Sequence, residues 1–365
     1  MNDVQLKAVV VSRNFNPGHY SHLLASYKVL SENNINTYMY HHALFNNMGV
    51  IEKKRVFNNI YELKALGKID LAIFWFPSFK NIIDTIFLRI FYRTQVVYVF
   101  HEPYESVRAY LDAGFGYLKT FKILLISVVN YLLVLLSNKV VLPSRKSFNT
   151  FETKYLHTNK KYVLIPLLFD DEAVQIKNGS ERFNISYIGT VAEDHAFDEF
   201  VTFAVHAIKN NWFPKYKFLI ATKSNLPLAQ RIALTPYITS GNVVIEEGKP
   251  MSNEVINKHY NNSVVVWNAY RRSMQSGVLP KAYMFGTPLI VSSSNLSEFF
   301  QDRQHGVVIN SKYDINELRE SVNNVIVNFE KYSLNCRSTF MTTFYYKAYE
   351  KILMDFIMDE KKVEL

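Results

Sequence analysis

Cysteine is nearly absent from this chain of 365 residues, which contains only Cys336. One thiol can form neither an internal disulfide nor a thiolate metal cage, so a disulfide scaffold and a zinc ribbon are both excluded. We therefore expect a reducing, cytoplasmic compartment. The first residues also differ from a signal peptide, because Asp3 and Gln5 precede a short apolar run that has no small-residue cleavage pattern.

The chain also lacks the short motifs of several enzyme classes. It has no GxxxxGK[ST] phosphate loop, no GxGxxG after the first apolar run, no HExxH and no GxSxG. The adjacent carboxylates Glu193 and Asp194 resemble a DxD metal motif only loosely. His19 and His22 have no carboxylate near them in the sequence, so we expect no metal site. We also expect no cofactor.

Positive charge is concentrated in one half of the chain. The net charge is +9, and residues 1–168 contain 20 Lys and Arg against 10 Asp and Glu, which leaves 21 basic and 22 acidic residues for the rest. This asymmetry predicts that the first half meets something anionic, such as nucleic acid, anionic lipid or a phosphorylated acceptor. Nucleic acid is the least favoured, because the basic residues are scattered and no recognition motif accompanies them.

Short apolar runs alternate with helical stretches in the first half. Such alternation predicts a parallel sheet that is covered by helices on both faces. The runs expected to be strands are LKAVVVS, INTYMY, DLAIFWF, QVVYVFHE and KVVLPS (6–12, 35–40, 70–76, 95–102 and 139–144).

The same pattern restarts in the second half, with a helix ending at Gly286 and an amphipathic helix after Asp314, where Glu317 completes a capping-box spacing. We therefore expect an α/β protein with one domain over 1–168, a second over 169–340, and a terminal helix in 341–365 that packs back on the first. Residues 161–173 are the expected hinge. The expected strands here are FNISYIGT, YKFLIAT, NVVIEEG, SVVVWNAY and TPLIVSS.

Two stretches of the first half are unusually apolar. Residues 121–137, FKILLISVVNYLLVLLS, reach the lower limit of a membrane span but contain Asn130 near their centre. Three interpretations remain open for them: a buried crossover helix, a helix on a membrane surface, and a true span. Residues 84–93, DTIFLRIFYR, fit either an ordinary amphipathic helix or one that lies on lipid.

The segment from Arg271 to Ser293 gives the strongest indication of ligand binding. A strand ends near Tyr270, a polar turn follows, and a helix begins near Val278. Unpaired N–H groups at the start of a helix bind phosphate. The residues expected to form such a site are Arg271, Arg272, Gln275, Ser276, Gly277 and Lys281.

The stretch SGVLPKAYMFGTPLIVSSSNLSEFFQDRQHGVVI resembles the donor-binding region of the GT-B glycosyltransferases, especially the glycosyltransferase 4-like enzymes of bacterial O-antigen and capsule synthesis. Those proteins read G-x-x-x-E-A-x-x-x-G-x-P and then E-x-x-x-D/N-x-x-x-G, and Glu298, Asp302 and Gly306 reproduce that tail. The resemblance implies two Rossmann-like α/β/α domains facing a central cleft. It also implies a nucleotide-sugar donor on the second domain, an acceptor on the first, and metal-independent transfer with retention.

The sequence departs from that pattern in the donor region. Lys281 stands where the family has a glutamate near the ribose, and residues 273–275 contain no acid where a second glutamate is usual. The Arg and Lys expected after the second domain's first strand are missing from GTVAEDHAF, so Lys223 and Arg271 become candidates for the diphosphate. These departures also leave open a catalytically inactive binding or scaffold protein.

The first half supplies the expected acceptor side. FHEPYES follows a predicted strand, and the resemblance places His101 beside the donor sugar, with Glu102 as a second candidate for catalysis. Glu105, His19 and His22 are candidates for acceptor binding, and Gly18 of the loop NFNPGHYSH is a candidate for donor binding, through close approach of its backbone to the diphosphate.

Taken with the basic charge, these features predict a transferase that moves a sugar from a nucleoside diphosphate sugar to a glycan acceptor. We expect that acceptor to be lipid-linked, in the synthesis of a surface polysaccharide. We expect it to lie on the inner face of the cytoplasmic membrane. The oligomeric state is not indicated by the sequence.

Overall fold

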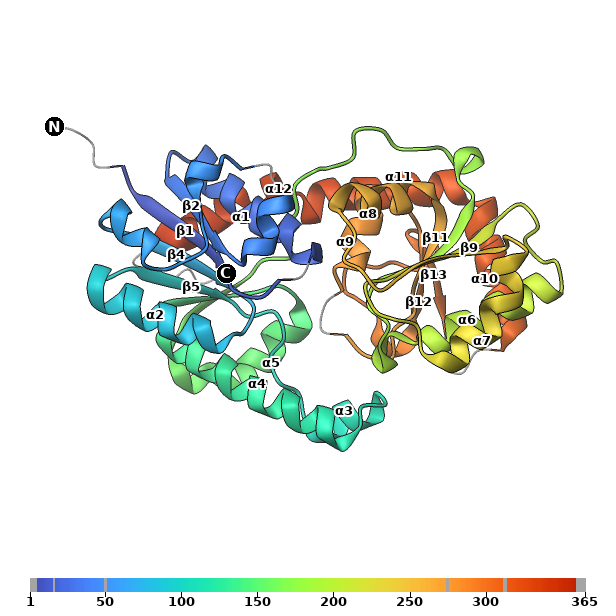
Figure 1. Ribbon diagram of the computed structural model, residues 1–365, viewed down its shortest axis with the longest axis horizontal. Coiled ribbons are helices and arrows are strands. Elements are labelled where there is room, and N and C mark those ends of the chain that lie inside the picture. The colour runs from blue at the N-terminus through green and yellow to red at the C-terminus, as the bar shows by residue number, and fades with distance from the viewer. Residues whose placement is uncertain (1–4, 16, 49–50, 274–275, 311–313, 359–365) are drawn as a thin grey trace. The chain divides into compact units, whose positions relative to one another are not determined.

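The computed structural model describes residues 5–15, 17–48, 51–273, 276–310 and 314–358. The chain folds as two compact units. Unit 1 contains Met1–Leu111, Gly116–Asp170 and Thr343–Leu365, and unit 2 contains Asp112–Phe115 and Asp171–Thr342. The chain thus passes between units two residues after the expected boundaries at 168 and 340 (Figure 1).

Unit 1 is built on a parallel sheet of seven strands in the order β3-β2-β1-β4-β5-β6-β7. All five expected strands are present. Two further strands, β3 and β7, were not expected; β7 occupies the start of the predicted hinge, because Lys161 pairs with Lys139 of β6. The strands are β1 (Lys7–Ser12), β2 (Asn36–His41), β3 (Val56–Phe57), β4 (Leu71–Trp75), β5 (Gln95–Val99), β6 (Lys139–Leu142) and β7 (Lys161–Leu164).

Helices cover the sheet of unit 1, and local sequence explains where several begin. The hydroxyl of Ser78 accepts a hydrogen bond from the Lys80 amide at the start of α2, and Ser144 forms a capping box with Ser147 at the start of α5. The helices are α1 (Tyr20–Glu32), α2 (Phe79–Tyr92), α3 (Val107–Asp112), α4 (Tyr117–Leu136), α5 (Arg145–Tyr155) and α12 (Tyr346–Met358).

The terminal helix α12 belongs to unit 1, although 172 residues of unit 2 precede it in the chain. Its attachment is specific. The amide of Phe169 donates to the carbonyl of Phe344 at 2.8 Å, and the Tyr346 hydroxyl donates to Glu32 of α1 at 2.8 Å. Helix α12 packs against α1 of the same unit (Figure 1).

Unit 2 repeats the architecture with a parallel sheet of six strands in the order β10-β9-β8-β11-β12-β13. The five expected strands are present, and β13 is an additional one. The strands are β8 (Asn184–Ile188), β9 (Lys217–Ala221), β10 (Val243–Glu246), β11 (Ser263–Asn268), β12 (Leu289–Ser292) and β13 (Gly306–Ile309).

The helix expected after Asp314 is interrupted at Asn328 and forms two helices, α10 and α11. Asp314 caps the first of them by accepting from the amides of Asn316 and Glu317, as its position predicts. The helices of unit 2 are α6 (Phe197–Lys209), α7 (Leu228–Thr239), α8 (Asn253–Asn262), α9 (Val278–Met284), α10 (Ile315–Val327) and α11 (Phe329–Thr339).

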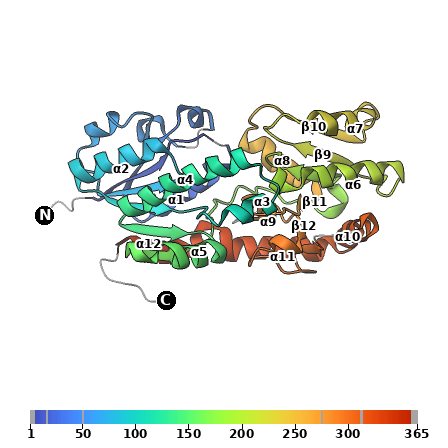
Figure 2. The same ribbon diagram turned by 90° about the horizontal axis from the view of Figure 1, so that it is seen from below.

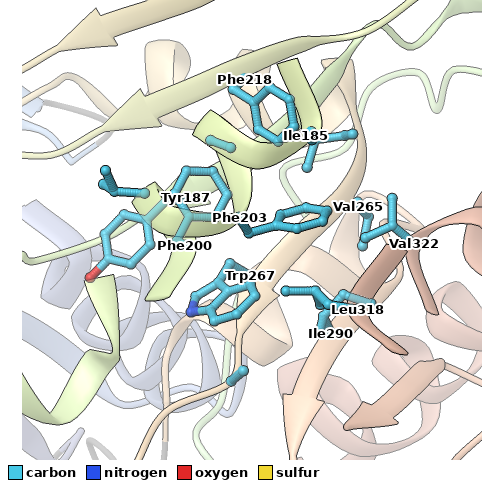
Figure 3. Close-up of a cluster of buried hydrophobic side chains, with 14 of the residues drawn as sticks. Ile185, Tyr187, Phe200, Phe203, Phe218, Val265, Trp267, Ile290, Leu318 and Val322 are labelled. Carbon is cyan, nitrogen blue, oxygen red and sulfur yellow. The ribbon is translucent and has the colours of Figure 1, made fainter. Parts of the chain in front are cut away.

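The core of unit 2 is rich in aromatic side chains. Phe200 and Phe203 of α6 lie against Phe218 of β9, and the Phe200 ring contacts Trp267 of β11 edge to face, with centroids 5.9 Å apart (Figure 3). Edge-to-face contacts of this kind add to the stabilisation from burial. The Phe200 ring also lies against Tyr187 of β8, so this packing fixes the central strands β8 and β11 and therefore the loops that follow them.

Gly306 at the start of β13 has a packing reason to be glycine. Its φ is +137°, and a Cβ there would lie 2.0 Å from the carbonyl oxygen of Leu289. The neighbouring strands β12 and β13 therefore pair closely only because this residue has no side chain. The glycine of the family's E-x-x-x-D/N-x-x-x-G pattern thus has a role in sheet packing here.

Candidate functional site

In each sheet, the direction in which the chain adds successive strands reverses at one point. Ligands of open parallel sheets bind at that point, outside the carboxyl ends of the strands. In unit 2 the chain runs from β8 outward through β9 and β10, then starts again at β11 and runs the other way. The corresponding strands of unit 1 are β1 and β4. The loops after these four strands are the natural places to search for a site.

In unit 2, the loop after β8 and the loop after β11 are joined by a small cluster of side chains. The Tyr270 ring stacks on His195 with centroids 4.1 Å apart and planes 4° apart. The Nδ1–H of His195 donates to the carbonyl of Thr190 at 2.8 Å. The Ser276 hydroxyl hydrogen-bonds to Tyr270 and partly opposes the rise in its pKa that burial causes. Tyr270 is therefore neutral and holds the two loops in one position.

Gly189 follows β8 directly and is the residue at which the backbone leaves the sheet. Its φ of +150° is one that side chains rarely tolerate, and a Cβ would lie 3.5 Å from the Tyr270 hydroxyl. The next loop is tied to it, because the Ser224 hydroxyl accepts from the Val191 amide at 3.3 Å. The edge of unit 2 thus presents glycine backbone between the loops that follow β9 and β11.

Lys223 lies in the loop after β9, next to Ser224, and its side chain is exposed. None of the described carboxylates lies within ion-pair distance of it. Its position beside the Gly189 loop makes it the predicted donor-binding cation that best matches a diphosphate. Lys217 is also exposed and lies at the opposite end of the same strand, away from this edge.

Arg271 is held by carboxylates of its own unit. Its Nη2 lies 2.8 Å from Asp198 and 2.7 Å from Glu199, both in the first turn of α6, and its Nη1 donates to the carbonyl of Glu193 at 2.6 Å. The pKa of Arg271 is raised by these partners against the opposing effect of burial. Arg271 therefore fastens the loop after β11 to α6, and a phosphate would have to displace two carboxylates to reach it.

Lys281 has a different partner from the one expected. Its Nζ lies 2.7 Å from the Oε2 of Glu172, and the two side chains are only 7% and 13% exposed. The same carboxylate accepts from Asn257 at 2.7 Å, and it also contacts Asn253. Lys281 is therefore a buried ion-pair partner rather than an uncompensated cation, which corrects the expectation that it supplies charge to a phosphate.

The remaining donor-side residues are placed as follows. Arg272 is buried, with 7% exposure, while Gly277 and Glu298 are exposed. Ser276 precedes α9, and its hydroxyl accepts from the Val278 amide at 3.2 Å. The helix itself is shorter than expected, with seven residues from Val278 to Met284, so its macrodipole is small. Gln275 lies outside the described residues.

In unit 1, three aromatic rings meet at the carboxyl edge of the sheet. The His19 ring stacks on Phe76 with centroids 3.5 Å apart, and the Phe76 ring lies 5.7 Å from that of His101. These residues follow β1, β4 and β5 respectively, so the structure brings two of the predicted histidines close to one phenylalanine. Burial lowers the pKa of His101, and Glu102 opposes that shift. His101 is therefore neutral at pH 7.

Phe76 occupies this position in a strained backbone conformation. Its φ is +61°, which is unusual for a bulky residue, and its side chain is 7% exposed. Asn81 of α2 supports the turn, because its Nδ2 donates to the carbonyl of Phe76 at 2.7 Å. Strain of this kind is often retained at functional sites. Phe76 belongs to no sequence motif, and its place before Pro77 at a strand end is the one signal in the sequence that points to it.

The other acceptor-side candidates differ in accessibility. His22 is 3% exposed, lies parallel to Trp75 and donates from Nδ1 to the carbonyl of Leu168 at 3.1 Å. It is a core residue, which corrects the expectation that it contacts an acceptor. Glu105 pairs with Lys146 at 3.1 Å, while Glu102 is exposed. Gly18 is exposed in a short 3₁₀ turn that precedes α1.

Three residues of the unit 2 edge were missed by the sequence analysis: Gly189, His195 and Tyr270. The stretch GTVAEDHAF lacks the Arg and Lys of the family pattern, and its carboxylates resemble a metal motif only loosely. Gly189 after a strand was the signal that could have pointed to the edge. Among the described residues, no group of three His, Cys, Asp or Glu side chains is arranged to hold a metal ion.

The sequence matches no protein-family model and no curated protein. Its structure, however, matches those of known transferases over almost the whole chain. A sucrose-phosphate synthase from Thermosynechococcus elongatus superposes with a TM-score of 0.71 over 96% of this chain and 98% of that chain, at 12% identity. WaaG, a glycosyltransferase involved in lipopolysaccharide biosynthesis, gives a TM-score of 0.64 over 97% and 100% of the two chains, also at 12% identity.

The chain has the GT-B fold. A third structure of this group is Anabaena HepE in complex with UDP-glucose, which matches with a TM-score of 0.68 over 96% of this chain and 99% of that chain, at 11% identity. The expected fold of two Rossmann-like α/β domains is thereby confirmed, with units 1 and 2 as the two domains of a GT-B protein. Identities of 10 to 13% establish the fold and leave the activity to be argued from the site.

Proposed function

We propose that this chain is a glycosyltransferase that moves a sugar from a nucleoside diphosphate sugar to a glycan acceptor. The observation that carries the proposal is the edge of unit 2, where Gly189, Tyr270 and Lys223 surround the direction change of a sheet with the GT-B fold. Of the similar structures, Anabaena HepE is described in complex with UDP and with UDP-glucose.

The donor is assigned to this edge of unit 2. The backbone around Gly189 and Thr190 allows a diphosphate to approach closely, and Lys223 supplies a cation. As the bond between the sugar and the diphosphate breaks, negative charge develops on the leaving group. Groups already fixed around that charge lower the barrier without reorganising.

The acceptor is assigned to unit 1. His101, Glu102, His19 and Gly18 lie after strands at the carboxyl edge of that sheet. A neutral imidazole at His101 can donate one hydrogen bond and accept another, which suits contact with sugar hydroxyls rather than with phosphate. Its half-buried position beside Phe76 strengthens such a bond by limiting contact with water.

The finer parts of the proposal come from the family resemblance. They are retention at the anomeric carbon, independence from a metal ion, and a lipid-linked glycan acceptor in the synthesis of a surface polysaccharide such as O-antigen or capsule. A cytoplasmic location on the inner membrane face belongs to the same proposal. The basic first half of the sequence, with a charge excess over residues 1–168, supports a phosphorylated acceptor.

A thermal-shift screen against uridine, guanosine, thymidine and adenosine diphosphate sugars tests the donor assignment. We expect at least one of them to raise the melting temperature saturably, because a ligand that binds only the folded state stabilises it. Lys223→Ala should weaken that shift, whereas the matched variant Lys217→Ala on the same strand should not. Absence of any shift across the panel would contradict the donor site.

A second candidate function is favoured by one observation. Lys281, at the position of the family's ribose-binding glutamate, is committed to an ion pair with Glu172. The lysine in place of that glutamate is consistent with a protein that binds a nucleotide sugar through this fold without transferring the sugar. Release of nucleoside diphosphate over time distinguishes the two: an enzyme releases it catalytically, and a binding protein gives the thermal shift alone.

A further inference from the structure

Helix α2 of unit 1 buries three polar side chains and exposes five large apolar ones. The side chains buried against the sheet include Asn81, Asp84 and Thr85. The exposed ones are Phe79 (74%), Ile83 (67%), Ile86 (41%), Ile90 (67%) and Phe91 (68%). An ordinary surface helix of a soluble protein has the opposite arrangement.

Helix α4 continues this apolar surface. Its outer face carries residues spaced three and four apart, which align along one side of a helix. That stripe consists of Leu118 (83%), Phe121 (58%), Leu125 (54%), Val128 (53%), Leu132 (37%) and Leu135 (39%). By length and composition α4 is also apolar enough to cross a membrane, with only 28% of its most apolar window buried.

The two helices are neighbours on one side of the unit 1 sheet, as both views show (Figures 1 and 2). The Nη1 of Arg89 on α2 donates to the carbonyl of Leu136 at the end of α4, at 2.5 Å. The exposed residues of both helices therefore form one continuous surface, which we call the α2–α4 face. A contiguous surface made of the large apolar side chains of two neighbouring helices marks a binding site.

The charged residues around the α2–α4 face indicate what it binds. The one acidic residue of the two helices, Asp84, is buried and paired with Arg13 at 3.3 Å. All the other charged residues within or directly after them are basic: Lys80, Arg89, Arg93, Lys119 and Lys122. Apolar side chains flanked only by cations match a membrane whose headgroups are anionic.

We propose that the α2–α4 face is an interfacial membrane-binding surface, with Phe79, Ile83, Ile90, Leu118 and Leu125 inserted among anionic lipids and the flanking lysines and arginines at the level of the headgroups. The proposal goes beyond sugar transfer and does not depend on it. It assigns the membrane contact to particular side chains, and it makes α2 rather than α4 alone part of the contact.

The face lies on the membrane and α4 does not cross it. The inner side of α4 belongs to the core of unit 1, where Val129, Leu133 and Val134 pack with the central strands. Asn130 accepts a hydrogen bond from the buried Tyr98 hydroxyl at 2.6 Å. If α4 crossed the membrane, these groups would leave the core and the Tyr98 hydroxyl would lose its hydrogen bond. Contact through the exposed face alone leaves the core intact and has no such cost in free energy.

Vesicle co-sedimentation of the full chain tests the proposal. The probes are vesicles of pure phosphatidylcholine and vesicles with about one third phosphatidylglycerol, each at low and high salt. We expect binding to the anionic vesicles, with weaker binding at high salt and on neutral vesicles. The quadruple variant I83S/I90S/L118S/L125S should bind at least about tenfold more weakly.

The matched control is L228S/I232S/V327S/L334S. These four side chains are exposed to a similar degree, between 64% and 74%, but lie on α7, α10 and α11 of unit 2. The control should bind vesicles as the unaltered chain does. Equal binding by the α2–α4 variant and the unaltered chain would overturn the proposal, as would failure of the unaltered chain to bind anionic vesicles at low salt.

A second measurement separates lipid from self-association. Sedimentation velocity without lipid should give the same mass for the unaltered chain and the α2–α4 variant, and a dimer that dissociates in the variant would overturn the proposal.

In Leu125→Trp, lipids brominated along the acyl chain should quench the new fluorescence, and quenching equal to that of the unaltered chain would also count against insertion. The thermal shift with a nucleotide sugar should persist in the variant, so loss of membrane binding and loss of the donor site are told apart.

Discussion

The Nζ of Lys281 and the Oε2 of Glu172 lie 2.7 Å apart, with both side chains almost excluded from solvent. The pair joins α9, which follows the donor-side turn, to the segment where the chain enters unit 2. The preceding residue, Asp171, is paired in turn with Arg337 of α11. Lys281 thus fixes the position of α9, and we predict that its role is structural.

Lys281→Met should destabilise the chain by about 3–5 kcal/mol, because it leaves the buried Glu172 carboxylate without its cation. The double variant K281M/E172Q removes both charges and keeps an oxygen for Asn257, so we expect it to recover part of that loss. Urea unfolding followed by tryptophan fluorescence measures the difference. If the single variant loses donor binding without losing stability, Lys281 contacts the donor and the structural role is wrong.

Gly306→Ala tests whether the family's terminal glycine acts in sheet packing. A Cβ at this position would collide with the backbone of Leu289, so we expect a loss of at least about 3 kcal/mol in the free energy of unfolding. Gly241→Ala is the control, because Gly241 also has a positive φ of +76° but open space around it. That variant should lose only about 1 kcal/mol. Equal losses would show that backbone strain alone explains Gly306.

Lys223→Ala should weaken the affinity for the nucleotide sugar by about 10- to 100-fold, because a charge-assisted hydrogen bond contributes about 1.5–3 kcal/mol. Isothermal titration calorimetry measures the dissociation constant. Lys217→Ala, at the other end of β9, keeps the same net charge as Lys223→Ala and should bind as the unaltered chain does. A similar weakening in both variants would point to long-range charge rather than to contact.

The pH dependence of His101 has a definite sign. Burial holds the pKa of His101 below its usual 6.5, so the unfolded chain takes up the proton first as the pH falls. The free energy of unfolding therefore decreases from pH 6.5 down to the pKa of the folded state, and His101 contributes no change above that window. His101→Gln should remove this part of the decrease, whereas the exposed His157→Gln should retain it.

Chelation tests the expected independence from metal. We predict that transfer continues at an unchanged rate after treatment with EDTA, because the leaving diphosphate would be stabilised by protein groups such as Lys223. Initial rates with and without added magnesium ions make the comparison. Loss of activity on chelation that magnesium restores would show that the proposed mechanism lacks an essential component.

Much of the fold followed from the sequence because buried parallel strands are continuous apolar runs, as in LKAVVVS and SVVVWNAY. Two of the three strands that were not expected have a physical reason. Val56–Phe57 is too short to show a pattern, and Lys161–Leu164 carries charged and aromatic residues at the edge of a sheet. The break at Asn328 was hidden because apolar residues continue with helical spacing on both sides of it.

The site was less predictable because a side chain's partner is set by tertiary contacts. Nothing near Lys281 in the sequence indicates Glu172, which lies 109 residues earlier. His22 resembled a loop residue, yet it packs in the core against Trp75. The contact between His19, Phe76 and His101 likewise depends on three strands lying side by side.

The central claim is that a nucleoside diphosphate sugar bound at the edge of unit 2 is the donor for sugar transfer. Release of nucleoside diphosphate from the panel of nucleotide sugars, in the presence of a lipid-linked glycan extract, tests it most directly. The account predicts catalytic release from one donor, reduced at least about tenfold in Lys223→Ala and in His101→Gln but not in Lys217→Ala. No release from any donor, or equal release by all of these variants, would contradict it.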